Sequence, residues 1–267
     1  MQSKKLGAIV LFGALFFGST ASAQVCPTCQ KCPEVKKECL KDTKHDGWNL
    51  STALGFNLTR GNTDTLLLNV NAKATKEEGN DIYRLEITGA EGEDKNKVDE
   101  KFGSTTQRKI QYDAEYKHLI SDRVYLGVGA TGAHDEIADI DYRYILKPAI
   151  GYFLIKDKTF ANFSVEAGPA YVFEKLGGVK NDYFSPRIAE RFEWFISDTA
   201  TFYEAAEVLF NVDDGDDTLV NAEAGLEAAI NSSINLVVAL KDVYDNLPAA
   251  GKERNDLAVV TGLQIKY

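Results

Sequence analysis

Four cysteines stand close together near the start of the chain, at a spacing that suits either a metal ion or disulfide bonds. They are Cys26, Cys29, Cys32 and Cys39, and the sequence contains no others. Four thiolates can hold zinc tetrahedrally, but the last spacing is too long for the usual iron–sulfur run. In an oxidising compartment, disulfides are favoured over a bound metal. We therefore expect disulfide bonds in this segment, with zinc as the alternative, and no other cofactor.

A second set of reactive groups consists of charged residues that alternate with apolar ones along the rest of the chain. Ten are basic and seven acidic: Lys73, Arg84, Glu86, Lys109, Asp113, Glu115, Lys117, Arg143, Lys147, Glu166, Arg187, Arg191, Glu193, Glu223, Glu227, Lys241 and Lys266. Successive side chains of a strand point to opposite faces, so the charges share one face. We expect this face to line the interior of a barrel.

Two interpretations of these interior charges stay open. Buried charges must be paired, so they could neutralise one another and fill a narrow barrel. Alternatively, the basic residues could line a small pore that prefers anions, because rings of charge give pores their selectivity. The basic residues of this second interpretation are Arg143, Lys147, Arg187 and Arg191.

Three further motifs resemble functional sites but lack the required context. Residues 127–132 match a dinucleotide-binding glycine pattern, yet no predicted helix follows them. Residues 211–217 are rich in aspartate, but their glycine is out of register with a calcium-binding loop. We expect a solvated outer loop there, with weak binding of Ca²⁺ or Mg²⁺ to lipopolysaccharide as the alternative. The histidines, His45, His118 and His134, have no convincing serine partner. We therefore predict that the protein is not an enzyme.

Strands must position these residues, because apolar residues recur with a period of two after residue 47. Twelve segments show this period: 48–58, 66–72, 83–87, 110–116, 124–130, 142–152, 163–173, 184–194, 201–210, 220–230, 234–240 and 257–267. The ninth segment is ambiguous. The pattern predicts an all-β fold, a transmembrane antiparallel up-and-down barrel of about 12 strands, with residues 47–267 as its domain.

The connections between the segments give an independent indication of a barrel. Those after odd-numbered segments include longer polar stretches, at 89–103, 134–141, 174–182, 211–218 and 245–256. Those after even-numbered segments are mostly tight, at 118–122, 156–158, 197–199 and 231–233. The connections at 60–64 and 76–81 are exceptions, the first short and the second longer. Bacterial outer-membrane barrels alternate short periplasmic turns with longer outer loops in this way.

The two ends of the chain predict export to the bacterial outer membrane. Lys4 and Lys5 precede an apolar run, and an Ala-Ser-Ala cleavage site follows at 21–23. This pattern predicts that residues 1–23 are a secretory signal peptide. Residues 24–46, which hold the cysteines, then form a periplasmic tail that a periplasmic partner could bind. The last strand ends on Tyr267, which we interpret as a signal for the barrel-assembly machinery.

Composition limits the partners of the protein. The formal net charge is −10, so nucleic acid is an improbable partner. After the signal peptide, no segment approaches the ~20 apolar residues of a membrane helix, so any membrane-spanning part must be a barrel. The expected partners are outer-membrane lipid and lipopolysaccharide of a Gram-negative cell.

The segment 48–56, running into Thr59-Arg-Gly-Asn-Thr-Asp-Thr65, resembles the start of a family of bacterial outer-membrane proteins named DUF481, or salt-induced outer-membrane proteins. Asn221-Ala-Glu-Ala-Gly-Leu226 is similar to a later part of that family. The resemblance covers residues 47–267 and implies a barrel and an outer-membrane location. It implies no activity. We therefore expect a structural role or a narrow, weakly anion-preferring diffusion channel. The alternative is a barrel-anchored protein whose acidic outer loops or cysteine tail bind a ligand or partner.

Overall fold

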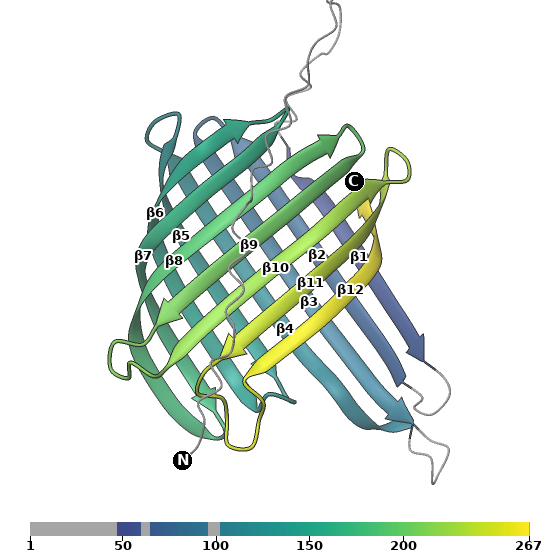
Figure 1. Ribbon diagram of the computed structural model, residues 1–267, viewed down its shortest axis with the longest axis vertical. Helices are drawn as coiled ribbons and strands as arrows, with labels where there is room; N and C mark the ends of the chain where they lie inside the picture. Colours follow the sequence, from purple (N-terminus) through teal and green to yellow (C-terminus); the bar gives the residue numbers. More distant parts are fainter. Residues whose placement is uncertain (1–46, 60–64, 96–101, 267) are drawn as a thin grey trace, which may run out of the picture. The chain divides into compact units, whose positions relative to one another are not determined.

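The chain folds into a closed antiparallel barrel of twelve strands (Figure 1). The structure is a computed structural model that describes residues 47–59, 65–95 and 102–266. Each strand pairs with its sequence neighbours, and β1 pairs with β12 to close the ring. The predicted fold class and strand number are thus confirmed, and the ambiguous ninth segment is a strand. The signal peptide, the cysteine tail with Cys26, Cys29, Cys32 and Cys39, and Tyr267 lie outside the described residues.

The strands have the following bounds: β1 Asn49–Thr59, β2 Thr65–Glu78, β3 Asp81–Lys95, β4 Phe102–Leu119, β5 Val124–Asp135, β6 Ile140–Asp157, β7 Ala161–Leu176, β8 Val179–Ser197, β9 Ala200–Phe210, β10 Thr218–Ala229, β11 Ile234–Asp245 and β12 Asn255–Lys266. The described ranges contain no helix long and apolar enough to cross a membrane.

The outer face of the barrel is mostly apolar. In β6, Leu146 and Ile150 are exposed, whereas Arg143 and Ile145 point inward and are buried. In β12, Val259 remains 65% exposed on the same outer face. A protein in water rarely leaves a continuous apolar surface of this kind uncovered, whereas a lipid-facing barrel requires one.

Aromatic side chains gather near the end of the barrel where β1 begins. The ring centres of Trp48 and Tyr83 lie 6.1 Å apart, and those of Tyr83 and Tyr116 lie 5.2 Å apart. Tyr171 and Phe173, with ring centres 4.6 Å apart, lie toward the other end of the barrel. Aromatic rings at both ends of an apolar band are typical of membrane barrels, where they sit at the headgroup level.

The two ends of the barrel differ in their connections. At the short-turn end, where β1 begins and β12 ends, the connections are 79–80, 120–123, 158–160, 198–199 and 230–233. At the opposite, long-loop end they are 60–64, 96–101, 136–139, 177–178, 211–217 and 246–254. The sequence therefore predicted correctly which end carries the longest connections.

Two predicted loops are wrong in length. The loop expected at 174–182 is a two-residue turn, because β7 and β8 continue as a hairpin to Gly177 and Gly178. The longer connection expected at 76–81 is also a two-residue turn, in which Gly79 has a φ of 60°. Both turns use glycine at positive φ, which side-chain-bearing residues rarely adopt and which lets the two strands keep their twist. Polar composition alone had suggested a loop where the strands extend further.

Tight packing inside the barrel leaves no room for a side chain at Gly151. Tyr125 on β5 lies over Gly151 on β6, and a Cβ at residue 151 would overlap the tyrosine ring. We expect Gly151→Ala to lower the free energy of unfolding by about 1–3 kcal/mol, because the ring must move. Denaturant unfolding followed by tryptophan fluorescence measures the change. Gly89→Ala, where a Cβ meets nothing within 4 Å, is the control and should be close to neutral. Equal losses in both variants would contradict the packing explanation.

Candidate functional site

A chain of alternating charges crosses the middle of the barrel. We call it the central ion-pair chain; it consists of Lys117, Glu166, Arg187, Glu207 and Lys147, from β4, β7, β8, β9 and β6. Lys117 Nζ lies 2.7 Å from Glu166 Oε1, and Arg187 Nη1 lies 2.9 Å from Glu166 Oε2. Arg187 Nε binds Glu207, and Lys147 Nζ lies 3.2 Å from Glu207 Oε2.

These five side chains are largely withdrawn from solvent. The side chain of Arg187 is 8% exposed and that of Glu166 is 10% exposed. Each carboxylate of the chain binds two cations, so none of its charges is left alone. Buried charges are tolerated only when they are paired and hydrogen-bonded, and this chain meets that condition.

A tyrosine fixes the position of Glu166 within the chain. Tyr125 is fully buried, and its hydroxyl donates a hydrogen bond of 2.9 Å to Glu166 Oε1. The Lys117 ammonium lies 5.0 Å from the centre of the same ring, within the range of a cation–π contact. The Glu166 carboxylate thus accepts hydrogen bonds from Tyr125, Lys117 and Arg187. These three contacts hold the centre of the ion-pair chain in one geometry.

A second bridge joins almost opposite walls near the long-loop end. Arg143 on β6 donates to Glu174 Oε2 at 2.6 Å through Nε and to Asp245 Oδ2 at 2.7 Å through Nη2. Glu174 belongs to β7, but Asp245 ends β11, which is five places from β6 in the ring of twelve. This Arg143 bridge therefore spans the interior of the barrel.

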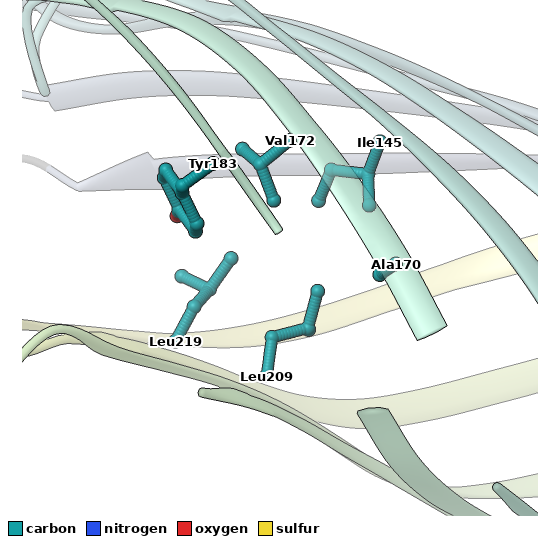
Figure 2. Close-up of a cluster of buried hydrophobic side chains, with 6 residues drawn as sticks. All are labelled: Ile145, Ala170, Val172, Tyr183, Leu209 and Leu219. Atoms are coloured by element: carbon teal, nitrogen blue, oxygen red, sulfur yellow. The ribbon is translucent and has the colours of Figure 1, made fainter. Parts of the chain in front are cut away.

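An apolar cluster lies beside the Arg143 bridge, inside the barrel. It consists of Ile145, Ala170, Val172, Tyr183, Leu209 and Leu219, with Val243 packed against it. Figure 2 shows the side chains from β6, β7 and β8 pointing toward those from β9 and β10. This part of the inner face is therefore apolar, and the predicted interior charges do not extend over it. Because the two walls approach each other here, apolar contact replaces water and is favourable.

The loop 246–254 contributes to covering the same end. Ala249 is only 6% exposed, and a Cβ at Gly177 would lie 3.4 Å from its Cβ. The loop also bonds to its neighbour, since Asn246 N donates to Thr218 O at 3.0 Å. The turn after β7 therefore touches the loop after β11, several strands away around the ring.

The interior is less filled toward the short-turn end. A cavity of about 250 Å³ lies there, which we call the short-turn cavity. Its lining residues are Lys73, Glu86, Arg191, Glu193, Phe195, Thr201, Tyr203, Glu223 and Glu227. Tyr203 packs over Gly225 and donates to Glu223 at 3.1 Å, much as Tyr125 packs over Gly151. The barrel is thus filled in its middle and near its long-loop end, and hollow toward its short turns.

The predicted interior residues fall into four groups in the structure. Those joined to carboxylates or cations are Arg143, Lys147, Glu166, Arg187, Arg191, Glu193 and Glu223, the last through Lys241 at 3.4 Å. Glu227 accepts a long hydrogen bond from Asn235 at 3.5 Å. Arg84 and Lys109 make no ion pair or side-chain hydrogen bond within the described part of the chain. Lys266, also expected inside, is exposed at the end of β12.

Three carboxylates of these bridges were missing from the sequence prediction. Glu174 and Asp245 had been assigned to loops, and Glu207 belongs to the strand that was ambiguous. A signal was present, because Glu174 continues the alternation of Ala170 and Val172 on the same face. Adding these carboxylates removes the excess of basic over acidic residues that the sequence had suggested for the interior.

The discounted motifs have structural roles. Residues 127–132 lie within β5, with no helix after them in the described structure. His118 Nδ1 lies 2.8 Å from Asp81, and His134 Nδ1 lies 2.9 Å from the carbonyl of Asp141. Among the described residues, no group of three or more His, Cys, Asp or Glu side chains is placed to hold a metal ion.

The acidic loop 211–217 is closed by its own hydrogen bonds. Asn211 Nδ2 donates to Asp217 Oδ2 at 2.8 Å, and Asp217 N donates to Asp214 O at 2.9 Å. Burial raises the pKa of Asp217 above its ordinary value, although the bond from Asn211 opposes this. The carboxylate of Asp217 is therefore occupied within the loop, and a cation-binding role has no support from this geometry.

Comparison with solved structures finds barrels of similar architecture. The NanC porin is 10% identical, with a TM-score of 0.51 over 82% of this chain and 100% of that chain. The KdgM porin is 8% identical, with a TM-score of 0.45 over 83% and 99%. The translocator domain of the autotransporter NalP from Neisseria meningitidis is 12% identical, with a TM-score of 0.44 over 85% and 90%. At such identities, the likeness to the NanC porin shows a common fold and nothing finer.

Comparison with curated proteins finds no match to the sequence. A family model does match, described as a protein of unknown function, DUF481, and it covers residues 52–267. The match includes all of the barrel from β1 onward except its first three residues. The resemblance inferred from residues 48–65 and 221–226 is thus confirmed, and the chain belongs to the DUF481 family.

Proposed function

We propose that this protein is an outer-membrane barrel that acts as a narrow diffusion channel, held closed at rest by charge pairs inside it. The observation that carries the proposal is the set of side-chain bridges across the interior, formed by the central ion-pair chain and the Arg143 bridge. Bridges of this kind fill the interior, yet side chains can move apart without unfolding the strands.

The membrane location rests on the outer surface. Exposed apolar side chains such as Leu146 and Val259 alternate with inward polar ones, and aromatic rings gather near the ends. Lipid and lipopolysaccharide of the outer membrane are the partners that this surface fits. In this orientation the short turns face the periplasm and the longer loops face outward, and the barrel-assembly machinery inserts the chain.

The charge balance inside the barrel argues against a strong preference for anions. The four basic residues expected to favour anions, Arg143, Lys147, Arg187 and Arg191, each bind a carboxylate. Paired charges leave little net field for a passing ion. We therefore propose at most a weak anion preference. We also propose no catalytic role, since His118 and His134 are held by Asp81 and a backbone carbonyl.

The alternative is a binding protein that uses its outer loops or tail. In the described outer loop 211–217, Asn211 and Asp217 form hydrogen bonds within the loop. This geometry lends the binding alternative no support. The tail from residue 24 to 46 lies outside the described residues, and its role as a site for a periplasmic partner stays a prediction.

Conductance in planar bilayers tests the channel proposal. We expect small currents from the unmodified protein and several-fold larger ones from the triple variant Glu166→Ala/Arg187→Ala/Glu207→Ala, because alanines remove the bridges from the middle of the barrel. The control is Glu91→Ala/Arg108→Ala/Glu136→Ala, which removes the same residue types from an exposed ion-pair group. This control should conduct like the unmodified protein.

The outcome that defeats the proposal is equally clear. If the folded triple variant conducts no better than its exposed control, the central ion-pair chain does not limit flow. If neither the protein nor the variant conducts, the barrel is a structural element and not a channel.

A further inference from the structure

The loop 246–254, which we call the lid loop, is fixed to the barrel by hydrogen bonds at its base. Asp245 N donates to Arg254 O at 2.8 Å, and Asn246 N donates to Thr218 O at 3.0 Å. The tip of the lid loop, residues 248–253, forms no hydrogen bond with any other strand or loop of the described chain. The base of the lid loop is therefore fastened, whereas its tip is held by other contacts.

The tip of the lid loop rests on the turn after β7. Ala249 is 6% exposed, and a Cβ at Gly177 would lie 3.4 Å from the Cβ of Ala249. This turn joins β7 to β8 and the lid loop joins β11 to β12, so β9 and β10 lie between the two in the ring. The lid loop thus crosses part of the opening at the long-loop end. Because few buried contacts hold its tip, this segment is of the kind that opens locally.

Asp245 connects the lid loop to the Arg143 bridge. Its Oδ1 accepts a hydrogen bond of 3.0 Å from Leu247 N, and its Oδ2 accepts one of 2.7 Å from Arg143 Nη2. One carboxylate therefore holds both the first turn of the lid loop and the arginine that spans the interior. If this carboxylate rotates away from Arg143, it also moves the acceptor of Leu247. Opening of the bridge and movement of the lid loop are coupled by this geometry.

We propose that the lid loop is a gate over the long-loop end of the barrel, latched to Arg143 through Asp245. While the Arg143 bridge is formed, the lid loop lies on the turn after β7 and limits entry. When the bridge breaks, the tip is released and solutes reach the interior. Loops that close over an interior site commonly control entry in this way. This inference rests on the proposed channel function and names the element that regulates it.

Reaction of a single interior cysteine with a charged methanethiosulfonate reagent tests whether the lid loop controls entry. The cysteine replaces Val243, which packs against the apolar cluster, in the full chain with its four tail cysteines changed to serine. Ala249→Trp should speed the reaction several-fold, because the larger side chain cannot fit against Gly177 and displaces the tip. Ala250→Trp, at the exposed neighbouring residue, is the control and should leave the rate unchanged.

Limited digestion with trypsin tests the latch. Cleavage after Lys252 requires the tip of the lid loop to leave its place, so its rate follows the population of the open form. Arg143→Gln should speed this cleavage several-fold. Arg108→Gln, which removes an exposed arginine that also binds two glutamates, should not. Cleavage after Lys158, in the short turn after β6, is the internal reference and separates local opening from general unfolding.

Two results overturn the proposal. The first is a folded Ala249→Trp variant in which the cysteine at residue 243 reacts no faster than it does beside Ala249. The second is an Arg143→Gln variant in which cleavage after Lys252 is unchanged relative to cleavage after Lys158. Neither readout needs a current. If both give the expected result and the barrel carries no current, the lid loop controls access to the interior and only the channel proposal fails.

Discussion

Replacing Arg187 with alanine should lower the free energy of unfolding by about 3–5 kcal/mol, which is the usual loss when one partner of a buried ion pair is removed. The guanidinium binds both Glu166 and Glu207, whose side chains are 10% and 14% exposed. Without it, two carboxylates keep only Lys117 and Lys147 as cationic partners. Denaturant unfolding in lipid vesicles, followed by tryptophan fluorescence, gives the change.

Arg108 provides a matched control for this prediction. It also binds two glutamates, Glu91 at 3.3 Å and Glu136 at 3.0 Å, but its side chain is 47% exposed. Exposed ion pairs contribute little, so Arg108→Ala should cost less than about 1 kcal/mol. Similar losses at Arg187 and Arg108 would show that burial of the ion-pair chain does not matter.

The double variant Glu166→Ala/Arg187→Ala separates charge from packing. It removes the arginine together with one carboxylate, so that Lys117 keeps Glu115 and Lys147 keeps Glu207. If uncompensated charge causes the loss in Arg187→Ala, the double variant should be less destabilised than the single one. A larger loss in the double variant would point to lost packing instead.

Epitope tags in two connections should differ completely in their exposure on intact cells. A tag inserted between Asp214 and Gly215, in the long-loop end, should bind antibody added from outside. A tag between Ser232 and Ser233, in the short-turn end, should be labelled only after the outer membrane is permeabilised. Both sites are exposed in the structure, so access depends on the side of the membrane. This prediction follows from the placement of longer loops outside and short turns inside.

Folding of both tagged proteins must be shown first, by the resistance of the barrel to protease. Labelling of the tag at residue 232 on intact cells, with none at residue 214, would reverse the orientation. It would also place the short-turn cavity on the outer side and not toward the periplasm. Labelling of both tags on intact cells would contradict a membrane-spanning barrel.

The sequence by itself determined the fold, because a strand repeats every two residues and lipid demands an apolar side chain at every second position. Leu146, Ile150 and Tyr152 were assigned to the outer face from this period alone, and all are exposed. The inward direction of Arg143 and Arg187 followed from the same period. Charge, export signal and family resemblance agreed with this interpretation.

The ends of the strands were less predictable, since a polar residue can extend a strand beyond the membrane as readily as it can form a loop. Glu174 was expected in a loop and lies in β7. The two-residue turns at 79–80 and 177–178 depend on which glycine adopts positive φ, and several glycines were available.

Only the tertiary structure decided which interior charges meet. The pairing of Arg143 with Asp245 joins residues on strands five places apart, and that of Lys117 with Glu166 joins β4 to β7. The period of a strand says which face a side chain is on, but not how far the opposite wall stands from it. That distance depends on the register and tilt of all twelve strands together. In the same closed barrel, Lys73 forms no ion pair with any described residue, although Glu86 faces it in register. A side-chain contact depends on the shape of the space inside the barrel as well as on the order of the residues.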